Sequence, residues 1–518
     1  KTDFDGLEID ASVAEINQGG QLGERLSVLW GQNLLDGRLN YYVSGEFQRN
    51  DEVLDSDVDW RRESWGLLSN DVDPASAPND GVPDLILVRD VRTYIRGTNF
   101  GGVTILATGV QPSPASDPDV PFGTCPTTSF SANCFSLAPS NRLDNGFLYT
   151  DTGASQPVVF GPIRQGAGFT RNASNGGLGQ VQNTEQGQSS RLPESTNWRF
   201  QSGFNYDLTD TINIFGEAKY VEEETYDAGQ RVFHDMNIRP FAAGTVGAIT
   251  GTTAFEIGLD NAYLPNDVRN AILNNRRNVY NSAGVITTAN VLDQRAQHKL
   301  YGPVRNQLNN RDLQRYVIGA RGEAGDIGFF RNVNWEAGYT YGEMNNTNRE
   351  QAVDVVRYQA AADAVVDTLG VVNGRAGEIV CRVQLLQAQG TAVPDAVVGG
   401  VTYSRQGDVI NDCSPVRVFG GGGFTPEGLE YMTAAITVTD QNKQHDFLAF
   451  ASGDLWDLWG AGPIGASFGY EYRKEITSGK GRDADTAGRF LFLNGGGDFA
   501  EASYYTDDIF GELRIPLF

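Results

Sequence analysis

Five oxygen-bearing side chains cluster in the first third of the chain, and hard cations such as calcium prefer oxygen ligands. They are Asp71, Asp73, Asn79, Asp80 and Asp84. The cluster departs from the EF-hand pattern, which requires a Glu at the last position of its loop. Two interpretations follow: a solvated turn, which the spacing favours, and a structural calcium site. Calcium would be the only cofactor that this sequence predicts.

A second group of candidates consists of basic side chains that could bind an anionic ligand, such as a ferric chelate or an acidic glycan. They are Arg164, Arg171, Arg231, His234 and Arg239. The alternative, which we favour for the arginines, is that each is a solvated surface charge. His234 gains slightly in interest because it lies close to Arg231 in the sequence.

Catalytic patterns are missing from the sequence. The three histidines, His234, His298 and His445, fall in different regions, and no HExxH, GxSxG or P-loop pattern occurs. The glycine run at 420–423 lacks the strand and lysine of a phosphate-binding loop, so we interpret it as a flexible loop. A net charge of −25 argues against nucleic acid as a partner, because phosphates need cations. We therefore expect neither an enzyme nor a nucleic-acid-binding protein.

The four cysteines form two pairs in loop-like stretches, Cys125 with Cys134 and Cys381 with Cys413. An even count in such regions predicts two local disulfides and an oxidising compartment. The alternatives are four free thiols or a zinc site. Zinc is the least favoured, because the chain has no CxxC pair and no nearby pair of histidines.

Ten segments of alternating apolar and polar residues must position these candidates, and alternation with a period of two predicts β-strands. The segments are residues 7–16, 24–34, 39–48, 197–206, 212–221, 313–323, 335–341, 444–454, 464–473 and 503–515. From the second join onward, short joins alternate with long ones. Asp36-Gly37 in a short join predicts a hairpin, because Gly accepts the positive φ of a tight turn.

The long joins occupy residues 51–196, 227–311, 346–443 and 477–501. Within them we expect short helices at Pro265–Arg276 and Ala352–Leu369, the second ending at Gly370. A further helix should start at Thr425-Pro426, because Thr can cap a helix and Pro suits its first turn. Long joins on one side and short turns on the other are typical of outer-membrane barrels.

One face of the segments is apolar, whereas the other carries charges. Glu46, Glu217, Lys219, Glu471 and Arg473 lie on the second face. A charge that faces hydrocarbon costs about 2–4 kcal/mol at the bilayer midplane, so in a membrane barrel these side chains must face the lumen. No stretch approaches the length of an apolar transmembrane helix. We therefore favour a transmembrane antiparallel β-barrel over a water-soluble sandwich.

Several segments resemble those of TonB-dependent outer-membrane receptors. They are the opening Lys-Thr-Asp-Phe-Asp-Gly-Leu-Glu-Ile-Asp, Asp59-Trp60, Asp207-Leu208-Thr209-Asp210 with Phe215-Gly216-Glu217-Ala218-Lys219-Tyr220, Gly462-Pro463-Ile464 with Gly469-Tyr470-Glu471-Tyr472-Arg473, and Gly511-Glu512-Leu513-Arg514-Ile515-Pro516-Leu517. The resemblance covers nearly the whole chain, 1–518, and its motifs are structural.

The resemblance implies a barrel of about 22 strands with a plugged lumen. The chain departs from it in lacking the plug and the later strands, so we expect the first half of a barrel, with about ten strands. The family also implies residence in the bacterial outer membrane among lipid and lipopolysaccharide. It further implies that the TonB complex drives the uptake of a scarce nutrient, such as a ferric siderophore, cobalamin or a glycan. The alternatives are a ten-stranded outer-membrane hydrolase and a surface β-sandwich adhesin.

Overall fold

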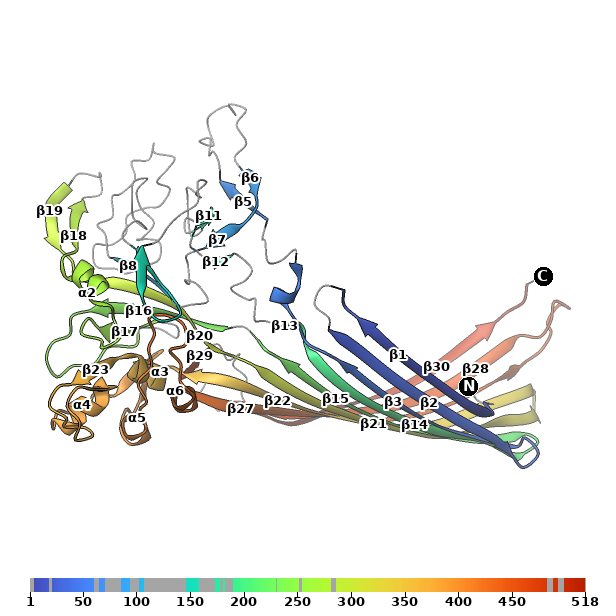
Figure 1. Ribbon diagram of the computed structural model, residues 1–518. Helices are drawn as coiled ribbons and strands as arrows, with labels where there is room; N and C mark the ends of the chain where they lie inside the picture. Colours follow the sequence, from blue (N-terminus) through green and yellow to red (C-terminus); the bar gives the residue numbers. More distant parts are fainter. Residues whose placement is uncertain are drawn as a thin grey trace.

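A single long antiparallel sheet dominates the structure, which is a computed structural model (Figure 1). The structure describes residues 4–17, 21–59, 65–69, 85–93, 102–106, 146–157, 173–177, 180–181, 190–229, 231–250, 254–280, 286–481, 488–491 and 498–517. Among the helices of these residues, none combines the length and the apolar character that a membrane span requires.

Eleven described strands form the sheet: ten long strands, each paired with its neighbours in chain order, and the two-residue β29 (Phe490–Leu491), which pairs with the end of β22. The ten long strands are β1 (Gly6–Glu15), β2 (Leu22–Leu34), β3 (Leu39–Asn50), β14 (Glu194–Thr209), β15 (Ile212–Asp227), β21 (Gln307–Ile327), β22 (Phe330–Asp354), β27 (Thr433–Asp454), β28 (Gly465–Lys480) and β30 (Phe499–Arg514). All of these pairings are antiparallel. Each long strand matches one predicted segment, which confirms a mostly β chain built on a large antiparallel sheet. Within the described residues, β1 and β30 are the two edges, so the sheet is open between them.

The turn between β2 and β3 confirms the predicted hairpin. Leu35, Asp36 and Gly37 all have positive φ, at 55°, 58° and 88°. The Gly37 N–H donates to the carbonyl of Leu34 at 3.1 Å, which closes the turn. The two strands that this short turn connects pair along their length, from Gly23 with Asn50 to Leu34 with Leu39.

The strands extend further into the long joins than the alternation predicts. β22 continues to Asp354 and β27 begins at Thr433, so the join expected at 346–443 spans 355–432. The other long joins, expected at 51–196, 227–311 and 477–501, span 51–193, 228–306 and 481–498. The extensions carry polar residues on both faces, for example Asn345 and Asn346, so the period of two that identifies a strand is lost there.

The long joins lie at one end of the sheet, opposite the short turns (Figure 1). The first two supply a six-stranded sheet in the order β10-β9-β8-β20-β16-β17. Its strands are β8 (Val103–Leu106), β9 (Gly146–Tyr149), β10 (Ser155–Pro157), β16 (Arg231–Arg239), β17 (Ala254–Gly258) and β20 (Ala296–Val304). The third supplies α3 (Val355–Ala362), α4 (Arg382–Ala388), α5 (Asp408–Asn411), α6 (Pro426–Met432), and the hairpins β23 (Ala364–Asp367) with β24 (Glu378–Cys381) and β25 (Ala396–Val398) with β26 (Val401–Tyr403).

Smaller elements complete the described chain. They are β4 (Val53–Leu54), η1 (Asp55–Asp57), β5 (Gly66–Ser69), β6 (Leu85–Val88), β7 (Val91–Thr93), β11 (Ala173–Asn175), β12 (Gln180–Val181), β13 (Ser190–Leu192), α2 (Asn266–Leu273), β18 (Arg276–Tyr280), β19 (Ile286–Leu292) and β29 (Phe490–Leu491).

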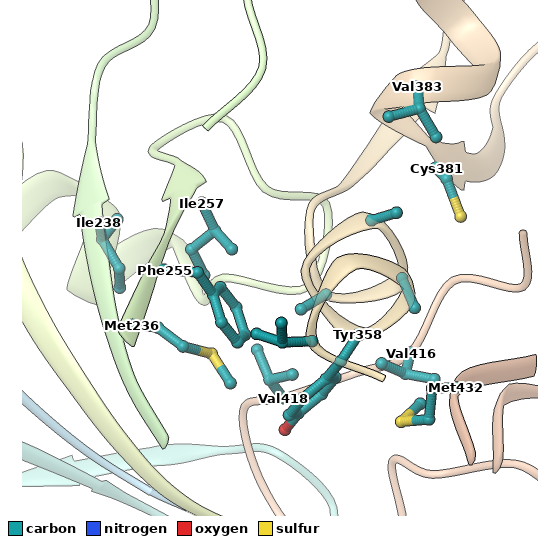
Figure 2. Packing of buried hydrophobic residues seen from close by; sticks show 14 of the residues in the cluster. Met236, Ile238, Phe255, Ile257, Tyr358, Cys381, Val383, Val416, Val418 and Met432 are labelled. Atoms are coloured by element: carbon teal, nitrogen blue, oxygen red, sulfur yellow. The ribbon is translucent and has the colours of Figure 1, made fainter. Parts of the chain in front are cut away.

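The three joins share one hydrophobic core. Tyr149 comes from the first join, Phe255 from the second, and Tyr358 and Phe419 from the third, and each is buried. Figure 2 shows Phe255 of β17 and Tyr358 of α3 facing one another, and their ring centroids are 5.3 Å apart. We call this unit the cap, defined as the described residues within 102–157, 231–304 and 355–432. A common core makes the cap a folded unit rather than a set of independent loops.

The helix predictions have mixed outcomes. α2 confirms the helix at Pro265–Arg276, and α6 confirms the start at Thr425, whose hydroxyl accepts a hydrogen bond from Gly428 N at 3.1 Å. The single helix expected at Ala352–Leu369 is wrong. The side chain of Asp354 caps α3, which ends at Ala362, and β23 follows because its valine-rich chain pairs with β24.

Candidate functional site

The register of the sheet sorts its side chains onto one apolar and one polar face. One row of directly paired residues runs Ile318–Tyr339–Phe447–Tyr472, and the adjacent row runs Val317–Thr340–Asp446–Arg473. Side chains alternate between the two faces of a strand, so these rows project to opposite sides. The five charged residues predicted for one face, from Glu46 to Arg473, do share the polar face.

Exposure runs opposite to the pattern of a water-soluble sheet. Ile318 and Phe468 on the apolar face are 62% and 61% exposed. Along β2 the apolar Leu26 is exposed, whereas Arg25, on the polar face, is half-buried. Exposed apolar side chains that gather on one face of a sheet are typical of contact with a membrane or a partner.

The apolar band crosses the sheet obliquely. One row of paired residues runs Leu26–Phe47–Trp198–Glu222–Asp312–Asn345–Gln441. This row is apolar at the β2 end and polar from β15 onward, so the band shifts along the strands as the sheet proceeds. The band therefore runs at an angle to the hydrogen-bond ladder and not along it.

Ion pairs link neighbouring strands on the polar face. The Arg25 guanidinium donates to Asp10 at 2.8 Å and to Glu46 at 2.6 Å, and Arg199 donates to the same Glu46. Arg25, Glu46 and Arg199 line a hollow of about 530 Å³, which Lys219 also borders. Because its charges pair with one another, this part of the face has little unbalanced charge.

A second hollow, of about 610 Å³, lies on the same face between β21, β22, β27, β28 and β30. Its lining includes amide, hydroxyl and carboxylate groups from Asn442, Gln444, Thr477, Glu475 and Tyr504. These residues were not among the candidates from the sequence. Their place on the polar side of the alternation was the only available signal, because their neighbours come from distant segments.

The predicted ligand residues on β16 do not come together in one site. His234 and Arg239 project to opposite sides of this strand. His234 is fully buried, with its ring 4.5 Å from that of Tyr358, whereas Arg239 is exposed and pairs with Glu256 at 2.7 Å. Arg231 lies on the same strand. Arg164 and Arg171 lie outside the described residues.

The disulfide between Cys381 and Cys413 is present and joins the start of α4 to the chain after α5, with a Cα–Cα distance of 6.3 Å. Cys381 is fully buried in the cap core. This pair confirms one of the two predicted bridges. Cys125 and Cys134 lie outside the described residues.

The candidate calcium ligands, from Asp71 to Asp84, also lie outside the described residues. In the part of the chain that the structure does describe, no group of three or more His, Cys, Asp or Glu side chains could hold a metal. Calcium binding therefore remains a prediction from the sequence.

His298 belongs to a buried chain of hydrogen bonds. Its Nε2 lies 2.8 Å from the carbonyl of Val418, so Nε2 must carry the proton. Nδ1 then accepts from the Thr104 hydroxyl at 2.9 Å, and Thr104 accepts from the Tyr149 hydroxyl at 2.7 Å. Burial lowers the pKa of His298 to about 4, so the ring is neutral near pH 7. His445 instead lies on the apolar face of the sheet, where Nδ1 is 2.7 Å from the Tyr339 hydroxyl.

Comparisons with protein-family models and with curated proteins find no match to this chain. The fold and the site alone define the class: a mostly β protein with a large antiparallel sheet, which has one apolar and one polar face and carries a folded cap at one end.

Proposed function

We propose that the ten long strands of the sheet are part of the wall of an outer-membrane β-barrel, and that the protein is a receptor that takes up a scarce nutrient. The observation that carries the proposal is the reversed exposure of the two faces. Apolar side chains such as Ile318 and Phe468 point to the surroundings, while the polar face holds paired charges. Exposed apolar surface is unfavourable in water and favourable in lipid.

The open edges support a larger barrel. β1 and β30 are exposed along their whole lengths, and each has a neighbour on one side only among the described residues. An unpaired edge carries unsatisfied backbone groups, which cannot remain in hydrocarbon. Both edges must therefore be paired when the sheet is in a membrane, and in the larger barrel that we propose further strands pair with them.

The cap supports a receptor. Its elements sit at the end of the sheet where the joins are long, and its common core presents a fixed surface. Such a surface can capture a ligand before the ligand enters the lumen. By its resemblance to TonB-dependent receptors, the protein would draw its energy from the TonB complex, and the barrel would perform no covalent chemistry.

Nitroxide labels on two adjacent residues test the membrane proposal. Ile318→Cys places the label on the apolar face, and Val317→Cys places it on the polar face of the same strand. The cysteines at 125 and 134 are replaced by serine, and the protein is inserted into liposomes as the complete receptor. We expect the label at 318 to collide mainly with oxygen, which concentrates in lipid. The label at 317 should collide mainly with a water-soluble nickel chelate.

Equal nickel accessibility at both positions would contradict the barrel and favour a water-soluble sandwich. Energy coupling is tested separately in cells, where uptake should stop when the proton gradient is collapsed. Uptake that persists without the gradient would contradict a TonB-driven receptor and would indicate a passive pore.

A further inference from the structure

The lining of the hollow of about 610 Å³ on the polar face includes one position without a side chain, Gly342 of β22, between Arg315 and Gln444 in the ladder. A Cβ atom built on Gly342 would meet no heavy atom within 4 Å. Leu313 and Met344, which are directly paired, provide an apolar strip next to it. This part of the lining is therefore open and partly apolar.

The charges around the hollow cancel. On the polar face, the charged side chains of its lining are one cation, Arg315, and one carboxylate, Glu475. Arg315 donates to Glu217 at 3.2 Å, so its charge is paired. Glu343 and Lys443 also border the hollow, but their side chains project to the apolar face because they alternate with Gly342 and Gln444 along their strands. An anionic ligand such as a ferric chelate needs an excess of cations, which this lining does not offer.

The polar groups of the rim offer both donors and acceptors. Glu475 accepts from the Tyr504 hydroxyl at 2.6 Å and from the Gln444 amide at 3.3 Å, and Asn442 accepts from Thr477 at 2.8 Å. Among the described residues, the amide nitrogen of Asn442 and the amide oxygen of Gln444 make no hydrogen bond. One of these atoms can donate and the other can accept.

From these features we infer that the hollow binds a neutral oligosaccharide. A sugar ring has an apolar C–H face, which suits the strip of Leu313 and Met344, and a rim of hydroxyl groups that each donate and accept. Paired donors and acceptors with no net charge match that rim. The inference rests on the proposed function, and it narrows the nutrient class to neutral glycans.

A glycan array, probed with the complete receptor in detergent, tests the inference. The array carries neutral glucans, xylans, mannans and galactans beside polygalacturonate and alginate, and ferric citrate serves as a soluble competitor. We expect binding to at least one neutral class and no competition by ferric citrate. Gly342→Trp should weaken that binding by at least about tenfold because it fills the hollow, and Gln444→Leu should weaken it by removing an acceptor.

Gly338→Trp is the matched control, since Gly338 lies on the same face of the same strand but does not line the hollow. It should bind like the unmodified protein. Heat-modifiable migration on gels checks that every variant is folded. Binding to acidic glycans alone, absence of neutral binding, or equal binding by both tryptophan variants would overturn the inference. The labels at 317 and 318 report membrane insertion independently, so failure of the sugar site and failure of the barrel are distinguishable.

Discussion

His298 illustrates how a single residue links the stability of the cap to pH. Its two ring nitrogens are both occupied, one by the Val418 carbonyl and one by the Thr104 hydroxyl. Protonation would place a second N–H against Thr104, which would have to reverse its own hydrogen bond. A buried charge would also lose its hydration. The neutral ring is therefore part of the folded state of the cap.

Acid should destabilise the cap through this residue. The unfolded chain takes up a proton on His298 near pH 6.5, whereas the folded cap takes it up only near pH 4. The contribution to stability is therefore complete above pH 6.5 and is lost as the pH falls toward 4, by about 3 kcal/mol in all. Amide exchange of cap residues between pH 4 and 8 measures it. His298→Gln, which cannot titrate, should flatten the dependence, and an unchanged slope in this variant would assign the effect to other groups.

The bridge between Cys381 and Cys413 should contribute to the cap alone. It closes a loop with a sequence separation of 32. Replacing both cysteines with alanine should cost roughly 3–4 kcal/mol, because the open loop gains entropy when unfolded. Limited proteolysis with mass spectrometry should then show faster cleavage in 382–412, while the long strands remain protected. Uniformly faster cleavage of the sheet would show that the bridge supports more than the cap.

At the scale of elements, the sequence predicts the parts of the strands in which apolar and polar residues alternate, and it does not predict the parts in which this alternation is missing. The segment at 335–341 identifies β22, but the polar stretch from Glu343 to Arg349 gives no period, and the strand nevertheless continues to Asp354. Its neighbours β21 and β27 hold it in place through backbone pairing, which no single segment reveals. The sequence does not predict the lining of the hollow of about 610 Å³ for the same reason. Gly342, Gln444 and Glu475 come from different strands, and only the strand register brings them together.

A charge should be tolerated on one face of a strand and rejected on the other. Ile318→Lys places an ammonium group on the apolar face and should cost about 2–4 kcal/mol in a bilayer. Val317→Lys places it on the polar face of β21 and should cost little. Urea titration in liposomes, followed by tryptophan fluorescence, compares the two. Equal costs would argue that neither face contacts lipid.

At the scale of the whole molecule, the sheet and the cap follow different stabilising principles. The sheet exposes its apolar residues, whereas the cap buries Phe255, Tyr358 and Phe419 as an ordinary globular protein does. The sequence predicts the first part through alternation and the side on which the joins are long. It does not predict that three joins meet in one core, because their apolar residues are scattered over more than 300 positions.

Loss of one core residue should therefore loosen all three joins together. Phe255→Ala should cost about 3–5 kcal/mol, because it leaves a cavity in the shared core. Hydrogen exchange should rise in parallel in β9, β20 and α3, which come from different joins. Leu369→Ala, at a site that is 77% exposed, is the control and should change nothing. A rise confined to β16 and β17 would show that the joins fold independently.

The shared core of the cap also restricts the register in which the long strands can pair. A slip of two residues between β15 and β21 would keep every side chain on its proper face, so alternation alone does not oppose it. The same slip would shift the strands on one side of this pair, and the joins that they carry, by about 7 Å relative to those on the other side. Side chains that are close-packed in one core cannot keep their contacts after such a shift. Tyr149, Phe255 and Tyr358, one from each of the three joins, share that core in the register described. The cap therefore favours this register over alignments that the alternation of the sheet alone would accept.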